Sequence, residues 1–290
     1  MPMFEKAVLI GCGLIGGSLA LALKQSHCVK HLTAVELNPQ SCQLALSRAV
    51  VDHVADSLQD AVQDADLIVL ATPVREMAAT LEVLAELPLR PGCLITDVGS
   101  TKREICAEAR RLLPASVVFI GGHPMAGSER SGVEAATSRL FQGSVYVLTP
   151  FADSDPDVFA KWKWAVERIG AQVMVLDPNL HDEVVAAISH VPHIIAAQLV
   201  EQVAKLSLES ESGALYARLA AGGFRDVTRI ASGNPLIWRD IVLSNRDVIR
   251  DLLQGWQQSI HHFLGMLEQE AGPEIENFFS KAAEFRDGMK

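Results

Sequence analysis

A histidine and a serine stand where two apolar segments end, in positions suited to proton transfer. His123 follows the apolar residues 117–120 in a Gly-Gly-His-Pro run. A histidine with an ordinary pKa of about 6.5 is neutral at cytoplasmic pH, so it can take a hydroxyl proton while a hydride leaves the same carbon. Ser100 precedes Thr101 and Glu104, which fit a capping box and leave Ser100 outside the cap. A loop histidine bonded only to backbone is the alternative.

An arginine farther along the chain is suited to binding an anion. Arg229 lies near Phe224, Ile230 and Trp238 rather than in a run of charges. Its planar guanidinium matches the two oxygens of a carboxylate. Asp226, three residues earlier, could instead form a plain surface ion pair with it. The sequence therefore predicts either an anion site or a surface pair at Arg229.

Two histidines, His190 and His193, lie three residues apart and share one face of a predicted helix. Such a pair can bind a metal ion, but no third ligand accompanies it at suitable spacing, and hydride transfer to a nicotinamide needs no metal. We therefore predict no metal. Buried polar packing is the plain alternative, and substrate contact is expected only if this face meets the cofactor crevice.

A glycine-rich turn near the N-terminus predicts a dinucleotide site. The pattern G-x-G-x-x-G at residues 11–16 follows an apolar strand and opens a helix, whose free N–H groups suit a diphosphate. Gly11 permits the tight turn, Gly13 lets the backbone approach the pyrophosphate, and Gly16 lets the helix pack on the strand. Glu36 ends the next predicted strand 20 residues after Gly16, as this type of site requires.

Glu36 favours NAD over NADP. A carboxylate there accepts hydrogen bonds from the ribose hydroxyls and repels a 2′-phosphate, and neither Leu37 nor Asn38 supplies an arginine. Thr72 and Pro73 follow a central strand at the carboxyl edge of the sheet, so they either contact the nicotinamide half or simply start a loop. The predicted cofactor-binding residues are Gly11, Gly13, Leu14, Ile15, Gly16, Glu36, Thr72 and Pro73.

The elements that must position these residues fall into two groups. Residues 1–176 alternate apolar runs with helical patterns, which predicts an α/β Rossmann domain with a doubly wound, mainly parallel sheet. Residues 177–290 show only helical periodicity and predict an all-α domain. The expected strands are 7–10, 32–35, 67–71, 93–97, 117–120, 144–148 and 172–175; expected helices include 14–24, 76–84, 102–112, 181–208, 212–221, 235–267 and 274–285.

Residues 184–203 are apolar almost all round the predicted helix, so we expect them to be buried either in a domain core or between subunits. A homodimer through the helical domain is the favoured interpretation, with a self-contained core as the alternative. Because the apolar runs are interrupted by polar residues, the sequence predicts no membrane-spanning helix.

The composition limits the possible partners and compartments. With 290 residues, 49% of them hydrophobic, two domains are expected. A formal net charge of −10 argues against nucleic-acid or anionic membrane surfaces. The first residues lack the pattern of a signal peptide, and the five cysteines lack metal spacing, which predicts reduced thiols in the cytoplasm.

Taken together, these motifs resemble the prephenate/arogenate dehydrogenases of tyrosine biosynthesis. The resemblance runs from the glycine-rich turn to about residue 270. Its specific parts, in this order, are His-Pro-Met-Ala-Gly from His123, Ser-His-Val-Pro-His ending at His193, and Gly-Gly-Phe-Arg-Asp-Val-Thr-Arg-Ile-Ala from Gly222. The glycine-rich turn at residues 11–16 is less specific, because it is common to many dehydrogenases.

The resemblance implies an NAD-dependent oxidative decarboxylation of prephenate, and of arogenate if the enzyme accepts it. His123 would take the proton of the 4-hydroxyl, and Ser100 would orient both His123 and that hydroxyl. Arg229 would bind a substrate carboxylate, with Asp226 holding its guanidinium. The residues expected to complete the substrate pocket are His181, His190, His193, Ser128, Glu129, Gly222 and Trp238. Some family members add an amino-acid-sensing domain or a chorismate mutase; we expect neither here, so tyrosine feedback would act at the active site.

Two other classes stay open at this point. A β-hydroxyacid dehydrogenase or imine-type reductase also joins a Rossmann domain to a helical domain. The former would use a lysine near the start of the long helix, where this chain has His190 and His193, and Lys205 comes too late. A non-catalytic NAD-responsive protein would need the glycine turn and Glu36 but not His123 together with Arg229.

Overall fold

The first half of the chain forms one twisted sheet in a computed structural model that describes residues 2–128 and 130–289. The sheet order is β3-β2-β1-β4-β5-β6-β7-β8, parallel throughout except where β6 and β7 pair antiparallel. The predicted Rossmann domain with a mainly parallel sheet is therefore confirmed. Its strands are β1 Phe4–Ile10, β2 Val29–Val35, β3 His53–Val54, β4 Leu67–Leu70, β5 Leu94–Asp97, β6 Val118–Pro124, β7 Val145–Pro150 and β8 Gln172–Val175.

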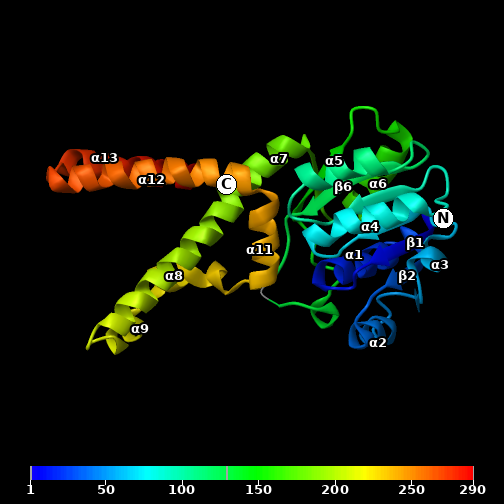
Figure 1. Ribbon diagram of the computed structural model, residues 1–290, viewed down its shortest axis with the longest axis horizontal. Coiled ribbons are helices and arrows are strands. Elements are labelled where there is room, and N and C mark those ends of the chain that lie inside the picture. The colour runs from blue at the N-terminus through cyan, green and yellow to red at the C-terminus, as the bar shows by residue number, and fades with distance from the viewer. Residues whose placement is uncertain (1, 129, 290) are drawn as a thin grey trace.

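Helices cover both faces of this sheet (Figure 1). Each face buries its own apolar cluster: one contains Leu19 and Trp162, and the other contains Ile68 and Phe119. The helices of this half are α1 Leu14–Gln25, α2 Pro39–Ser47, α3 Leu58–Val62, α4 Val74–Glu86, α5 Arg103–Leu112, the 3-10 turn η1 Val133–Ala135 and α6 Pro156–Arg168.

The second half is entirely helical among its described residues, as predicted. Asp177 caps its first helix by accepting hydrogen bonds from the backbone of Asn179 and Leu180. The elements are α7 Pro178–Val185, η2 Ala186–His190, α8 Val191–Glu209, α9 Ala214–Leu219, α10 Gly222–Thr228, η3 Arg229–Ser232, α11 Pro235–Ser244, α12 Arg246–Glu268 and α13 Gly272–Gly288.

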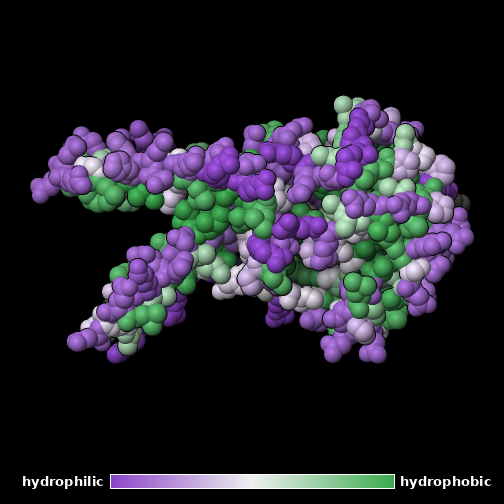
Figure 2. Space-filling view, viewed as in Figure 1, coloured by the Kyte–Doolittle hydropathy of each residue, from purple (hydrophilic) through white to green (hydrophobic). Residues whose placement is uncertain are grey.

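Two helical arms project away from the sheet, one formed by α8 and α9 and the other by α12 and α13 (Figure 1). The buried apolar cluster of this half contains only Ala186, Val191 and Ile249. Ile188 is 60% exposed and Leu199 41% exposed, so the alternative of a self-contained core around residues 184–203 is wrong. Figure 2 shows apolar residues gathered on the underside of the α12–α13 arm and where the arms meet.

The continuous helical run 178–209 is long and apolar enough to cross a membrane by length and composition alone, contrary to the sequence expectation. One such helix is weak support for a membrane span. Only 28% of its most apolar window is buried within the chain. The exposed apolar side of the run therefore needs a covering that one chain does not supply.

Candidate active site

His123 lies inside β6, where it pairs with Val147 of the antiparallel strand β7. The alternative of a loop histidine is therefore wrong. A Cβ atom on Gly121 would collide with the Thr149 hydroxyl, and one on Gly122 would collide with the Asp97 carbonyl. The two glycines serve close packing, and the strand holds the imidazole in a fixed place.

A chain of hydrogen bonds runs from His123 into the helical domain. Nδ1 of His123 lies 2.8 Å from Nε2 of His181, and Nδ1 of His181 lies 2.7 Å from Oδ1 of Asp182. The Asp182 carboxylate also accepts the backbone N–H groups of Lys102 and Arg103, at 2.8 and 3.0 Å. His181 and Asp182 are fully buried, at the start of the helical domain.

These contacts decide which imidazole nitrogens carry protons. The Asp182 carboxylate accepts only, so a neutral His181 ring donates from Nδ1 and accepts at Nε2. His123 must then donate from Nδ1, which leaves its Nε2 as an unprotonated acceptor. His181 is the described residue that hydrogen-bonds the ring, and the expected orienting role of Ser100, which lines the same cavity, stays a prediction.

The pKa of His123 is held well below its ordinary value, mainly because the ring is buried, and further because His181 and Lys102 lie nearby. Burial likewise lowers the pKa of His190 to about 4, although Asp182 opposes the shift. Burial also lowers the pKa of His193. All three imidazoles are therefore neutral at neutral pH, which is the state a proton acceptor needs.

A buried ion pair supports the strand ends beneath His123. Lys102 and Asp97 are both fully buried and pair through Nζ and Oδ2. Asp97 also accepts the N–H of Gly99 at 2.8 Å and that of Gly122 at 3.1 Å. Because Gly122 precedes His123, the pair fixes β5 against the part of β6 that carries the imidazole.

The N-terminus of α5 is capped by the other domain rather than locally. The predicted capping box of Thr101 with Glu104 is wrong, because the helix begins at Arg103 and its free N–H groups meet the Asp182 carboxylate. The Thr101 hydroxyl lies 3.0 Å from that of Ser244 on α11. An anion at a helix N-terminus is favourable, so the contact of the Asp182 carboxylate with the start of α5 joins the two halves of the chain.

A cavity of about 460 Å³ lies between the sheet and the helical half, beside His123. On the sheet side it is lined by Ser100 and by the segment after β6, which includes Ser128. On the helical side it is lined by Arg229 and Trp238. The predicted residues that line this cavity are Ser100, His123, Ser128, His190, His193, Arg229 and Trp238.

Other predicted pocket residues lie elsewhere. His181 is behind His123 rather than in the lining, which makes it a positioning residue. Gly222 and Asp226 lie on α10 outside the lining, and a Cβ on Gly222 would come no closer than 3.8 Å to the Asp226 carboxylate. The predicted residue Glu129 lies outside the described residues.

A π-helical segment, η2, brings Ser189 and His190 to this cavity. Pro192 follows and lacks the N–H that a regular helix would bond, which accounts for the wider turn. His190 Nδ1 lies 3.3 Å from the Asn245 amide, so its Nε2 carries the proton. His193 stacks on Trp238 with ring centroids 3.7 Å apart. Together these rings form a rigid, partly apolar wall.

The segment that follows β6 is anchored to the cofactor half. Arg48, at the end of α2, donates to the carbonyls of Val133 at 3.0 Å and Ala136 at 3.2 Å. The Ser18 hydroxyl on α1 accepts the N–H of Thr137 at 3.0 Å. These bonds fix the rim of the cavity against α1 and α2, a role that the sequence motifs did not reveal.

The glycine-rich turn has the shape a dinucleotide requires. Gly11 has a φ of +91°, and a Cβ on Gly16 would collide with the Gly11 carbonyl. A Cβ on Gly13 would meet nothing within 4 Å, so its backbone faces open space. The buried Thr72 hydroxyl has no hydrogen-bond partner among the described residues and lies beside this turn, at the end of β4. The residues present therefore fit an NAD molecule.

Glu36 stands next to the turn at the end of β2. One carboxylate oxygen accepts the Cys12 N–H at 2.8 Å, and the other accepts the Asn38 N–H at 2.9 Å. Each oxygen keeps a second acceptor position for a ribose hydroxyl. Backbone bonds thus hold the carboxylate in the place that the NAD prediction requires.

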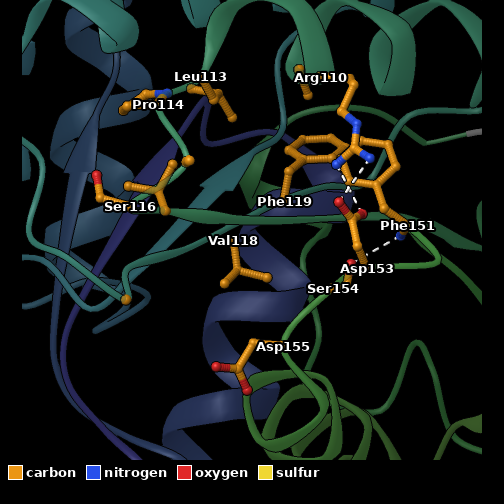
Figure 3. Close-up of a pocket in the computed structure, with 14 residues that line it drawn as sticks. Arg110, Leu113, Pro114, Ser116, Val118, Phe119, Phe151, Asp153, Ser154 and Asp155 are labelled. Carbon is orange, nitrogen blue, oxygen red and sulfur yellow. Dashed lines mark hydrogen bonds and ion pairs between the residues drawn. The ribbon is translucent and has the colours of Figure 1, made fainter.

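A second hollow, of about 600 Å³, is lined by Val118 and Phe119 at the start of β6 (Figure 3). His123 lies toward the other end of this strand. An exposed ion pair of Arg110 with Asp153 spans the hollow at 2.8 Å, and the arginine also covers the Phe151 ring. None of the predicted catalytic or cofactor residues lines it. Its size alone gives no reason to place the chemistry there.

The glycine turn, Glu36 and the histidine cavity define an NAD-dependent oxidoreductase built from a Rossmann domain and a helical domain. The nucleotide-binding domain model of prephenate dehydrogenase matches residues 19–175, and the dimerization domain model matches residues 177–281. The chain belongs to the prephenate dehydrogenase family, as its motifs predicted.

Relatives in other organisms match nearly the whole of this chain. The prephenate dehydrogenase of Bacillus subtilis is 41% identical over 99% of this chain and 76% of its own. The A. aeolicus prephenate dehydrogenase in complex with hydroxyphenyl propionate and NAD+ superposes with a TM-score of 0.90, at 30% identity, covering 99% and 98% of the two chains. The Synechocystis arogenate dehydrogenase superposes with a TM-score of 0.83 at 32% identity, covering 98% of this chain and 99% of its own.

Proposed function

We propose that the cavity beside His123 is where this chain carries out the NAD-dependent oxidative decarboxylation of prephenate to 4-hydroxyphenylpyruvate, CO2 and NADH. The observation that carries the assignment is the chain from Asp182 through His181 to His123, which leaves a base at Nε2 of His123. The glycine turn and Glu36 would hold NAD+, which supplies the hydride acceptor when bound.

His123 takes the proton of the 4-hydroxyl as the hydride leaves carbon 4 of the substrate ring. The bond from carbon 1 to the ring carboxylate then breaks, and its electron pair restores the aromatic ring as CO2 departs. The proton on His123 returns to the phenolic oxygen, so no net proton is released. His181 and Asp182 hold the ring in place while it carries that proton.

The remaining lining residues bind and orient the substrate. Ser100 hydrogen-bonds the 4-hydroxyl, and Arg229 holds a carboxylate from the helical side of the cavity. His190 offers an Nε2 proton donor, and His193 with Trp238 forms the wall beside the ring. We place the boundary between the cofactor domain and the substrate domain at residues 176 and 177.

The purified protein tests this function directly. It should form NADH from NAD+ when prephenate is supplied, with CO2 released in equal amount. The rate with arogenate in the same assay measures how strongly the enzyme prefers one side chain over the other. NAD+ binding without turnover of either substrate would favour the non-catalytic alternative.

The cofactor preference should be at least about tenfold for NAD+ over NADP+. Glu36, held by the Cys12 and Asn38 N–H groups, would accept hydrogen bonds from the ribose hydroxyls, and its charge would repel a 2′-phosphate. Measuring kcat/KM with both cofactors, before and after Glu36→Ala, checks this preference. Asp60→Ala, on the neighbouring helix α3, is the control for a lost surface carboxylate. Equal efficiencies with the two cofactors in the unaltered enzyme would refute the role of Glu36.

We further propose a homodimer through the helical domain, acting in the cytoplasm without nucleic-acid or membrane partners. The dimerization model over 177–281, the small buried cluster of this half and its exposed apolar arms support the dimer. The net charge of −10 argues against binding to anionic polymers or lipids. Sedimentation equilibrium should give twice the chain mass, and a monomer at micromolar concentration would contradict it.

A further inference from the structure

The cavity carries two fixed positive charges, one from each side. Arg229 comes from η3 of the helical domain, and Arg130 comes from the segment that follows β6. His123, His190 and His193 also line the cavity, but their lowered pKa values leave them neutral. The two guanidiniums are therefore the cations that the described lining offers to an anionic ligand.

The substrate assigned above carries two carboxylates. One is attached directly to ring carbon 1, and the other ends the pyruvyl side chain, two carbons farther out. With the 4-hydroxyl against His123, both carboxylates lie at the far end of the ring. The side-chain carboxylate then extends farthest toward the rim of the cavity.

Arg130 stands at this rim. Its N–H donates to the Ser128 hydroxyl at 3.1 Å, and the segment beyond it is anchored by Arg48 and Ser18. The side chain is exposed, and it forms no ion pair within the part of the chain that the structure describes. The guanidinium is thus placed beside the cavity without a charge partner in residues 2–128 or 131–289.

We propose that Arg130 binds the side-chain carboxylate of the substrate and thereby favours the keto acid over the amino acid; this rests on the function proposed above. The prephenate side chain is an anion, whereas that of arogenate adds an ammonium group and has no net charge. A guanidinium attracts the prephenate side chain more strongly than that of arogenate, because the ammonium group of arogenate repels the guanidinium. Arg130 is then a specificity-determining residue for the choice between the two substrates.

Arg130→Gln tests the proposal, with Arg139→Gln on the same segment as the matched control, since Arg139 is exposed and does not line the cavity. Arg130→Gln should raise KM for prephenate about five- to tenfold, as expected for an exposed or charge-assisted contact, with kcat nearly unchanged. The Ki of 4-hydroxyphenylpyruvate, which keeps only the side-chain carboxylate, should rise by a similar factor. The preference for prephenate over arogenate should fall, and Arg130→Lys should recover part of it.

Other outcomes would overturn the proposal. A rise in KM for prephenate without a change in the Ki of 4-hydroxyphenylpyruvate would place Arg130 at the ring carboxylate instead. A loss of kcat at unchanged KM would mean that the residue only supports the loop, and a weakened Kd for NAD+ would assign it to the cofactor. Calorimetric binding of 4-hydroxyphenylpyruvate tests Arg130 even if neither substrate is turned over, so failure of the proposed function stays distinguishable.

Discussion

His123→Asn should lower kcat for prephenate by about 10²–10⁴-fold while KM changes little, because a positioned general base contributes a factor of this size. Asparagine fits within β6 and keeps a polar side chain, but it cannot take the hydroxyl proton at neutral pH. Steady-state NADH formation with saturating NAD+ measures the loss. A kcat within a few-fold of the unaltered enzyme would move the base to another residue.

Two controls separate this loss from damage to the fold. His53→Asn changes an exposed histidine on the short edge strand β3 and should leave kcat unaffected. The His123 variant should stay folded, since the pairing with Val147 uses only backbone atoms, but the lost bond to buried His181 should lower its unfolding temperature. A variant that no longer binds NAD+ would show that the change had disrupted the sheet.

Activity should fall on the acid side of the pH profile, because only neutral His123 accepts a proton. Burial, His181 and Lys102 hold its pKa below the ordinary value of about 6.5, so the fall should lie below that pH. Between pH 7 and 8 the rate should be nearly constant. A loss of kcat that begins above pH 7 on acidification would contradict the lowered pKa.

Much of the fold follows from local patterns in the sequence. Apolar runs marked the long strands because buried parallel strands read as continuous hydrophobic segments. The edge strand β3 contains only His53 and Val54, too short for any periodicity, and was missed. The end of β6 was also missed, since Gly121 and Gly122 are typical of a turn; only pairing with β7 keeps them in a strand.

The chemistry of the site was predictable residue by residue but not in its connections. His123 and Arg229 stood out through their type and neighbours. His181 and Asp182 meet His123 from a segment 58 residues away, and no local pattern reports a contact at that separation. The adjacent His-Asp pair, directly after a capped helix start, was the available signal. Arg130 and Arg48 likewise gain their places only from the path of the segment after β6.

Arg229→Ala should raise KM for prephenate roughly tenfold to a hundredfold, because hydrogen bonds to charged groups contribute about 1.5–3 kcal/mol and each 1.4 kcal/mol is tenfold. Arg229 lines the cavity from the helical side, opposite the strand that carries His123, so it binds rather than transfers protons. The Kd of NAD+ without substrate should barely change, since the glycine turn lies on the other domain. Initial rates over a range of prephenate concentrations give KM, and calorimetry gives the Kd.

Two further variants decide between anion binding and a structural role for Arg229. Arg229→Lys keeps the charge but loses the two-pronged geometry, so it should recover only part of the lost affinity. Arg225→Ala, on the preceding helix α10, removes an exposed arginine that does not line the cavity and should leave KM unchanged. If Arg229→Ala instead lowered the unfolding temperature and left KM intact in the folded fraction, the arginine would serve only in a surface ion pair. Another group would then have to hold the carboxylate, and the remaining lining cation is Arg130.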